Sequence, residues 1–212
     1  MTAPVPPEWR PEDLSNYDDV LGRACGTELA RLLALSPAEK AAALRDPRAT
    51  HRNLYLGLTP PGFEEYAGTY REAVRTSLVG RTVTAAKFGD GCAPAFARPD
   101  QVERMMAGLY AGCVDALVEE PAGDQDKQFG ALSKLFYAFG LIHPFLDGNG
   151  HVQRLVFAVG AVLCDRIAVT PSWTIHPRDY DIEMAKAFNG RGNVGDRMKA
   201  VAALLRAYIT LV

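Results

Sequence analysis

The segment His151–Arg166, HVQRLVFAVGAVLCDR, constrains the fold more than any other part of the sequence. From Leu155 to Cys164 it contains only apolar residues and one glycine, so a helix over this segment would be apolar on nearly all its faces. Such a helix has no polar side to turn toward water and must be enclosed by protein. The apolar run is also too short to span a bilayer. The sequence therefore predicts a central buried helix that the other elements surround.

Amphipathic segments that could enclose this helix lie on both sides of it. Ser36, Pro37 and Glu39 form the pattern of a capping box and predict a helix start. The period of the apolar residues predicts helices over 19–35, 36–45, from Pro61 onward, from Asp100 to 117, 129–142, 151–166, 177–188 and 194–212. The predicted core face of the helix after Asp100 consists of Val102, Met105, Met106, Leu109, Cys113 and Leu117.

Residues 76–99 lack the helical period. They carry β-branched residues and the turn-forming stretch FGDGCAP, which predict a β-hairpin or an ordered loop. The expected fold class is therefore all-α with one short hairpin. A chain of 212 residues without internal repeats is expected to form one domain, residues 1–212, with 1–50 as an N-terminal helical extension of a core over 51–212.

Charge, cysteine spacing and the N-terminus each exclude a class of function or location. A net charge of -2 gives no general attraction to nucleic acid or to anionic lipid, so neither is an expected partner. The N-terminus lacks the basic start and apolar run of a secretory signal, so a cytoplasmic location is expected, although the non-cleaved signal of a translocated effector would escape this test. The four cysteines form no C-x-x-C pattern and are expected to be reduced thiols: Cys25, Cys92, Cys113 and Cys164.

The stretch HPFLDGNGHVQR, His143–Arg154, has the least common composition in the chain. Pro144 disfavours the helical conformation of the residue before it, so the preceding helix should end at His143. Gly148 and Gly150 predict a loop whose backbone amides can turn inward beside the start of the next helix. Amides at a helix N-terminus are a common phosphate site.

Three side chains of this stretch add further chemistry. Arg154, one turn into the helix, can donate two charge-assisted hydrogen bonds to phosphate oxygens. Asp147, beside the loop, is placed to bind a magnesium ion that the phosphates also coordinate. His143 can accept the proton of an incoming hydroxyl near neutral pH. A base, a metal ligand and a phosphate site together predict phosphoryl or nucleotidyl transfer.

HPFLDGNGHVQR resembles the signature of the Fic family, H-P-F-x-[DE]-G-N-G-R-x-x-R. HRNLYLGLTPPGFEEYAGTYR is similar to the segment before the family's flap hairpin, and PRDYDIEMAKAFNGRGN is similar to the helix after its core, so the likeness runs from about His51 to the end of the chain. The resemblance implies a mostly helical fold with a flap, about residues 76–99, that pairs with a target segment by strand addition. It also implies transfer of AMP from ATP to a Ser, Thr or Tyr hydroxyl of a target protein.

The resemblance also implies a role for each matching residue. His143 would be the base, Phe145 a buried anchor and Asp147 the ligand of Mg²⁺. Gly148, Asn149 and Gly150 would hold the phosphates of the nucleotide, Arg154 would reach the terminal phosphate, and Tyr180 and Asn189 fall near positions that contact the nucleobase in relatives.

His151 stands where the family usually has the first arginine of the signature. Histidine is shorter and cannot donate two parallel hydrogen bonds, so phosphate binding is expected to be weaker or to depend on pH. Some family members transfer UMP, phosphocholine or a phosphoryl group, which leaves the donor open. The inhibitory pattern [ST]-x-x-x-E-[GN] is not found. A separate antitoxin could supply the inhibitory glutamate, the enzyme could run unrestrained, or His151 could itself keep activity low.

Structural interpretations and two other functions stand beside this one. Taken singly, the residues could serve as a helix C-cap (His143), a helix N-cap (Asp147), an ion-pair partner (Arg154) and a solvent-facing side chain (His151), while His51 and His176 are expected to be structural. A Fic-like module could bind a nucleotide or a protein without turnover. A metal-dependent hydrolase could use the two histidines of the stretch and its aspartate, although the GNG sequence breaks the helix that would align them.

Overall fold

The computed structural model describes residues 6–71, 73, 76–79, 81, 96–120, 123–177 and 181–212. Its helices are α1 (Tyr17–Ala34), α2 (Pro37–Arg45), α3 (Arg48–Tyr55), α4 (Val102–Met105), α5 (Ala111–Glu119), α6 (Gln125–Ile142), α7 (Asn149–Leu163), α8 (Asp181–Phe188) and α9 (Val194–Arg206). A π-helical turn, Met106–Tyr110, joins α4 to α5, and single 3-10 turns cover Pro11–Asp13, Leu56–Leu58, Glu64–Tyr66 and Pro99–Gln101. The predicted helical fold is confirmed.

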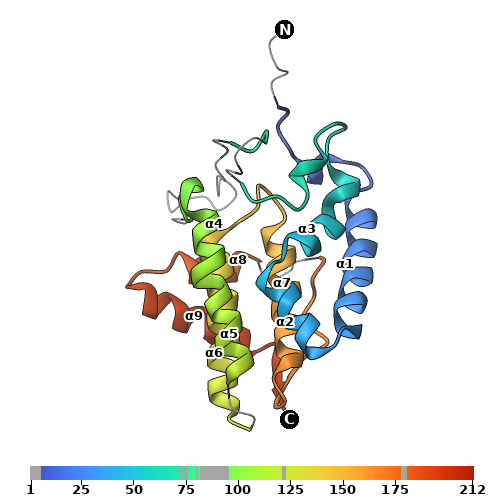
Figure 1. Ribbon diagram of the computed structural model, residues 1–212. Helices are drawn as coiled ribbons and strands as arrows, with labels where there is room; N and C mark the ends of the chain where they lie inside the picture. Colours follow the sequence, from blue (N-terminus) through green and yellow to red (C-terminus); the bar gives the residue numbers. More distant parts are fainter. Residues whose placement is uncertain are drawn as a thin grey trace.

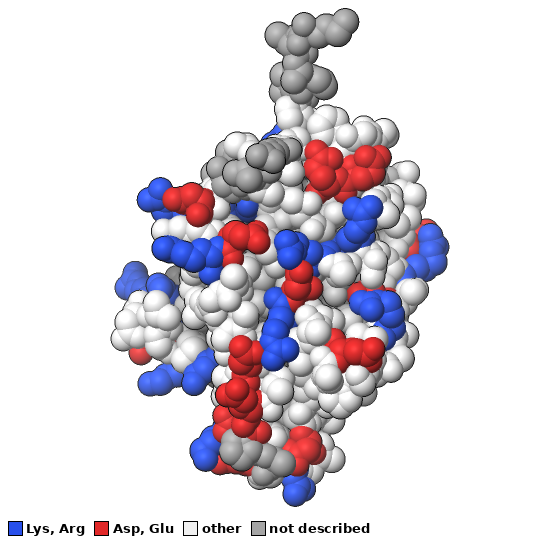
Figure 2. Space-filling model, viewed as in Figure 1, with Lys and Arg blue, Asp and Glu red and all other residues white. Residues whose placement is uncertain are grey.

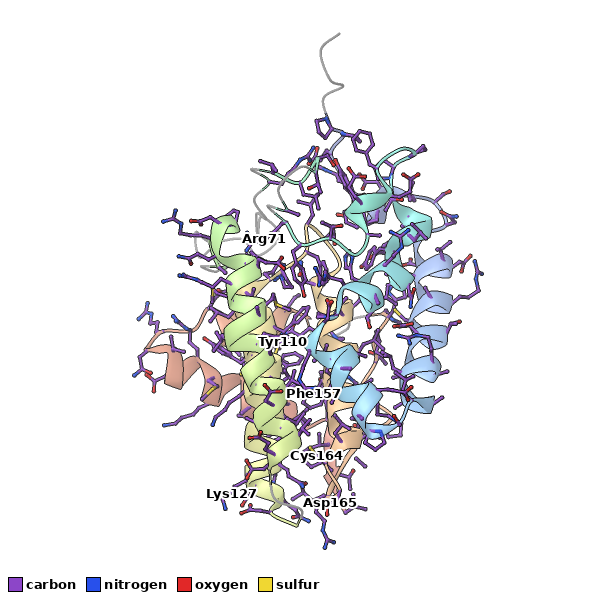
Figure 3. The ribbon with its side chains drawn as sticks, in the orientation of Figure 1. Arg71, Tyr110, Lys127, Phe157, Cys164 and Asp165 are labelled. Carbon is purple, nitrogen blue, oxygen red and sulfur yellow. The ribbon has the colours of Figure 1, made fainter. Side chains whose placement is uncertain are left out.

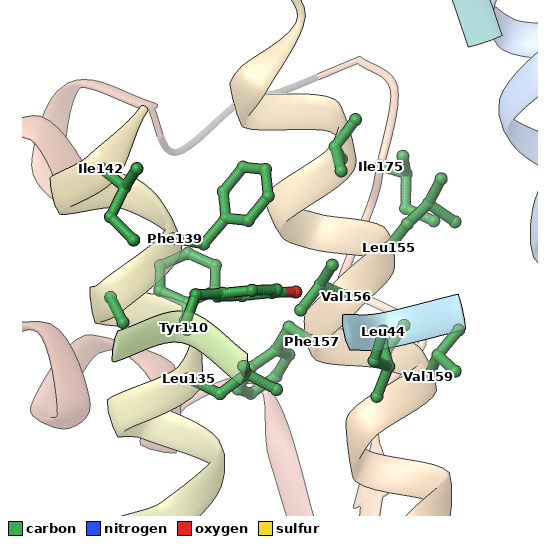
Figure 4. Close-up of a cluster of buried hydrophobic side chains, with 14 of the residues drawn as sticks. Leu44, Tyr110, Leu135, Phe139, Ile142, Leu155, Val156, Phe157, Val159 and Ile175 are labelled. Atoms are coloured by element: carbon green, nitrogen blue, oxygen red, sulfur yellow. The ribbon is translucent and has the colours of Figure 1, made fainter. Parts of the chain in front are cut away.

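Helix α7 is the central element of the fold. It contacts α1 and α2 on one side and α5 and α6 on the other, as Figure 1 shows. Apart from Gly150, every residue from Asn149 to Ala161 is buried, which confirms the prediction from the apolar run. Figure 4 shows side chains of α2, α6, α7 and the π-helical turn meeting in one cluster around Tyr110. Helix α7 is thus enclosed by helices on both of these sides.

The segment between residues 99 and 119 is helical as predicted, but its buried face differs. In a π-helical turn each hydrogen bond spans one residue more than in an α-helix, so the residues that follow are rotated. Leu109 is therefore 47% exposed and Cys113 only half-buried, although both were expected in the core. The buried residues are Val102, Met106, Tyr110, Val114 and Leu117.

Two other sequence predictions were wrong, and a third falls mostly outside the described residues. Over the described residues 61–71 the helix expected after Pro61 is absent, because Gly62 and Gly68 take positive φ values of 80° and 90° on either side of the short turn Glu64–Tyr66. Helix α3 was missed; it begins directly after Pro47, which occupies its N-cap. The predicted hairpin falls mostly on residues 82–95, outside the described residues; of its flanks, 76–79 form a turn and 96–98 are irregular.

The end of the chain is also not wholly helical. Helix α9 ends at Arg206, and Ile209–Leu211 form strand β2, which pairs antiparallel with β1, Ile167–Val169. β-branched residues such as Ile and Thr favour a strand there over continuation of the helix. This small sheet ties the C-terminal segment to the residues that follow α7.

Acidic and basic side chains alternate over the face seen in Figure 2. Exposed ion pairs such as Arg45 with Asp115 and Arg48 with Asp46 bring opposite charges together on the surface. In the described ranges, no helix combines the length and the apolar character needed to cross a bilayer. Cys25, Cys113 and Cys164 are free thiols.

Candidate active site

The signature loop, defined here as residues 143–148, connects the end of α6 to the start of α7. His143 is the C-cap of α6: its backbone is left-handed, with φ 52°, and its amide donates to the Phe139 carbonyl at 2.9 Å. Pro144 follows, so the helix stops where the sequence predicted. Helix α7 begins at Asn149, two residues earlier than expected, and of the two glycines only Gly148 has a positive φ, 75°. Gly150 lies in the first turn of the helix.

Asn149 braces the loop from within. Its Oδ1 accepts from the Phe145 amide at 2.8 Å and its Nδ2 donates to the Phe145 carbonyl at 2.9 Å. Both backbone groups of a fully buried residue are thereby satisfied by one side chain. The side-chain amide of Asn149 is therefore a structural part of the loop. Any contact of Asn149 with a phosphate would come from its backbone amide.

His51 supports the loop from α3. Its ring stacks on that of Phe145, with centroids 3.9 Å apart and planes 9° apart. Nδ1 accepts from the Gly68 amide at 2.8 Å, so the other nitrogen, Nε2, donates to the Asp147 carbonyl at 3.0 Å. Burial lowers the pKa of His51 to about 3, which keeps the ring neutral. His51 is structural, as expected, and it locates the backbone of the residue predicted to bind magnesium.

The start of α7 presents backbone donors. Within the described part of the chain, no group accepts a hydrogen bond from the amides of Asn149 and Gly150. The N-cap is Gly148, and no side chain among the described residues caps this helix end. Unpaired amides and the helix dipole together favour an anion at this position. A Cβ on Gly148 would lie 2.3 Å from Cε2 of Tyr55, so the ring of Tyr55 packs directly against the N-cap residue of α7.

Asp147 lies two residues before the first residue of α7, and Arg154 is the sixth residue of this helix. Asp147 is half-buried, and its carboxylate accepts a hydrogen bond from the amide of Gly148. Arg154 is 2% exposed, and its Nη1 donates to the Gly150 carbonyl at 3.2 Å. Its own carbonyl accepts from Trp173 Nε1 at 3.2 Å, which fixes the backbone of the helix there. The guanidinium is thus held at the first turn of α7.

His143 lies at the opposite end of the loop, and its ring is half-buried. It stacks on Phe96 with centroids 3.9 Å apart. Its carbonyl accepts from Arg71 Nε at 2.8 Å. The loop thus places an imidazole at one end and the open amides of α7 at the other.

His151 is 1% exposed, so the interpretation of it as a solvent-facing residue was wrong. Nδ1 is 2.8 Å from the Tyr55 hydroxyl and Nε2 is 3.2 Å from Nδ1 of His176. His176 in turn bonds Asp18 of α1 at 3.2 Å. Both ring nitrogens of His151 therefore have protein partners. This geometry does not support His151 as a phosphate ligand, nor as a ligand of a hydrolytic metal.

The two residues predicted near the nucleobase lie farther along the chain. Tyr180 is outside the described residues. Asn189 directly follows α8, and its amide donates to the Ala185 carbonyl at 3.0 Å. The preceding residue, Phe188, stacks on Tyr137 of α6 with centroids 5.1 Å apart. Asn189 is therefore one residue beyond a contact with the helix that carries His143.

Sequence reasoning missed how four residues outside the signature hold it: His51, Tyr55, Arg71 and His176. Three of them lie in the stretch HRNLYLGLTPPGFEEYAGTYR, whose polar and aromatic residues were noted only as a resemblance. The spacing of His51 and Tyr55, four residues apart, could have indicated one helix face directed at a single target.

Comparison with known proteins identifies the family. The model of the Fic/DOC family matches residues 43–160, which include α3, α6, the signature loop and most of α7. The match covers more than half of the 212 residues and ends before Asn189. Among curated proteins, no sequence matches the chain. The helical fold, the loop between α6 and α7 and this match agree: the chain belongs to the Fic/DOC family.

Proposed function

We propose that this protein is a transferase that moves AMP from ATP, or another phosphate-containing group from a nucleotide, to a hydroxyl side chain of a target protein. Membership of the Fic/DOC family indicates group transfer. The observation that carries the proposal concerns the backbone amides of Asn149 and Gly150. Neither amide donates a hydrogen bond to any described residue. The loop that leads to them begins at His143, so one short segment joins an anion site to a potential base.

In the proposed reaction the donor phosphates bind at the start of α7. The amides of Asn149 and Gly150 and the guanidinium of Arg154 would neutralise the charge on the phosphate oxygens. The acceptor hydroxyl oxygen attacks the α-phosphorus while His143 takes its proton. The bond from the α-phosphorus to the bridging oxygen breaks, and pyrophosphate leaves with the electron pair. Most of the acceleration would come from positioning and charge neutralisation.

Asp147 is the proposed magnesium ligand. Magnesium in nucleotide sites is commonly bound by one or two protein carboxylates together with phosphate oxygens, so a single half-buried carboxylate beside the anion site suits it. When bound, the ion supplies further neutralisation of the phosphates. Asp147 would hold it, and the bonds from Gly148 and His51 would fix the position of Asp147.

The proposal also covers the acceptor side chain, the cellular compartment and the inhibition of the enzyme. The acceptor would be a Ser, Thr or Tyr of a partner protein, and the compartment the cytoplasm of the producing or of a host cell. A separate antitoxin could restrain the enzyme. Residues 1–212 would act as one domain, because a single cluster of buried side chains runs from Trp9 to Leu205.

Incubation of the purified protein with a cell lysate and radiolabelled nucleotides tests this function. ATP, UTP, GTP and CTP are each supplied with label at the α- or the γ-phosphate, and CDP-choline with label in choline. We expect α-label from ATP on lysate proteins with the wild type and none with His143→Ala. Transfer of γ-label alone would instead identify a phosphoryl donor. Nucleotide binding by calorimetry without transfer of any label would support a binding module and refute the enzyme.

A further inference from the structure

The chain that leads into α4 is tied directly to the end of α6. The Ala97 amide donates to the Leu141 carbonyl at 3.0 Å, and the Ala97 carbonyl accepts from Arg71 Nη2 at 2.5 Å. Residues 96–98 have no regular secondary structure of their own, so these bonds decide where they lie. They lie beside the last turn of the helix that ends in His143.

Arg71 connects this segment to the signature loop. Besides Ala97, its guanidinium donates to the carbonyl of Ile142 at 3.0 Å and to that of His143 at 2.8 Å, while its backbone amide donates to the Pro144 carbonyl at 2.9 Å. Its side chain is 2% exposed, and it lies at the end of the bundle opposite Lys127 and Asp165 (Figure 3). A cation at the C-terminal end of a helix interacts favourably with the last carbonyls.

Phe96 lies flat against the imidazole of His143. The ring centroids are 3.9 Å apart and the ring planes differ by 18°. Stacking covers one face of the imidazole. The nitrogens donate and accept hydrogen bonds in the plane of the ring, so their access is set by the ring's edge and not by the covered face.

We infer that Phe96 and Arg71 are positioning residues for His143: Arg71 holds the backbone of this residue and Phe96 holds its ring. The inference rests on the proposed role of His143 as the base. A half-buried histidine can adopt several χ1 and χ2 angles, and a flat neighbour at stacking distance excludes most of them. A base must lie within hydrogen-bond reach of the proton that it removes, so fixing the ring raises the rate without contact between Phe96 and the donor.

Truncation of Phe96 tests the inference in two measurements. Phe96→Ala removes the flat surface, Phe96→Leu keeps apolar volume without a ring, and Phe96→Tyr keeps the ring. Phe63→Ala is the matched control, because Phe63 is also half-buried and contacts an aromatic ring, that of Tyr66, away from the loop. In the transfer assay we expect kcat to fall about 10–100-fold for the Ala and Leu variants, with KM for the nucleotide nearly unchanged and activity kept by the Tyr variant.

The second measurement does not depend on activity. In NMR spectra of histidine-labelled protein, the ring protons of His143, assigned by their absence in His143→Ala, should be shifted upfield by the ring of Phe96. We expect this shift to disappear in Phe96→Ala and Phe96→Leu and to persist in Phe96→Tyr and Phe63→Ala. Unchanged His143 signals in Phe96→Ala would overturn the inference. If the wild type transfers no label, the proposed function fails, and the NMR result still decides whether Phe96 stacks on the ring of His143.

Arg71→Lys tests the inference that Arg71 holds the backbone of His143. Lysine keeps the charge but lacks the fork that reaches three carbonyls. Arg81→Lys is the control, because Arg81 also donates to backbone carbonyls, those of Pro6 and Pro7, outside the loop. We expect a loss of the upfield shift of His143 and a fall in kcat for Arg71→Lys alone. A folded Arg71→Lys with wild-type His143 signals and kcat would refute the role of Arg71.

Discussion

Replacement of Gly148 by alanine should destabilise the protein through two separable effects. The first is conformational: φ is 75° at Gly148, and an L-residue in the left-handed region costs about 1–2 kcal/mol. The second is steric: the new Cβ would lie 2.3 Å from Cε2 and 2.6 Å from Cζ of Tyr55. Forcing additional atoms into a packed site costs about 1–3 kcal/mol. The expected loss in the free energy of unfolding is therefore about 2–5 kcal/mol.

Tyr55 cannot easily move to relieve this overlap. Its side chain is fully buried, its hydroxyl lies 2.8 Å from Nδ1 of His151, and its ring stacks on that of His51 with centroids 5.0 Å apart. A displaced ring would break the hydrogen bond and open space beside a second aromatic ring. The steric part of the loss should therefore appear nearly in full.

Urea unfolding followed by tryptophan fluorescence measures both parts. Gly62→Ala is the matched control, because Gly62 has φ 80° and its Cβ would meet no atom within 4 Å, so only the conformational cost of about 1–2 kcal/mol applies. The same substitution of Gly148 in a Tyr55→Ala background should likewise cost only the conformational part. If Gly148→Ala costs no more than Gly62→Ala in the wild-type background, the ring of Tyr55 does not form a rigid wall against the start of α7.

Three further substitutions test the supports of the fold. His51 has a pKa of about 3, below its ordinary value of about 6.5. The unfolded chain therefore binds a proton at this position more readily than the folded protein does. The free energy of unfolding should be highest above pH 6.5 and about 3 kcal/mol lower at pH 4. Urea unfolding should show this loss for the wild type and not for His51→Gln. Asn149→Ala leaves two buried backbone groups of Phe145 without partners and should cost about 2–6 kcal/mol in urea unfolding; a loss below 1 kcal/mol would contradict the brace. Ser36→Ala removes the reciprocal cap with Glu39 and should lower stability by about 1 kcal/mol in the same assay, whereas an unchanged midpoint would contradict its contribution.

Sequence patterns predicted those helices and helix ends that are determined by residues close to them in the sequence. The all-round apolar run identified α7 as the central helix, Pro144 placed the end of α6, and the capping box at Ser36 placed the start of α2. The π-helical turn Met106–Tyr110 has no such local signal, and it rotated the face on which Leu109 had been expected to be buried.

Side-chain roles in the site depended on partners distant in the sequence. His151 was expected to face the phosphates or the solvent, but its partner Tyr55 is separated from it by 96 positions and its partner His176 by 25. Asn149 was recognised as part of the signature, yet a sequence cannot say whether its amide reaches a ligand or the backbone of Phe145. Such roles follow from packing between helices, which one sequence does not encode in any short pattern.

The surface carboxylate of Asp18 also sets the direction of hydrogen bonding deep beneath it. An ionised carboxylate can only accept, so Nε2 of His176 carries the proton toward Asp18; with a neutral ring, Nδ1 must then accept from Nε2 of His151. Nδ1 of His151 in turn accepts from the hydroxyl of Tyr55. In each of the three hydrogen bonds the proton is therefore carried by the group farther from Asp18.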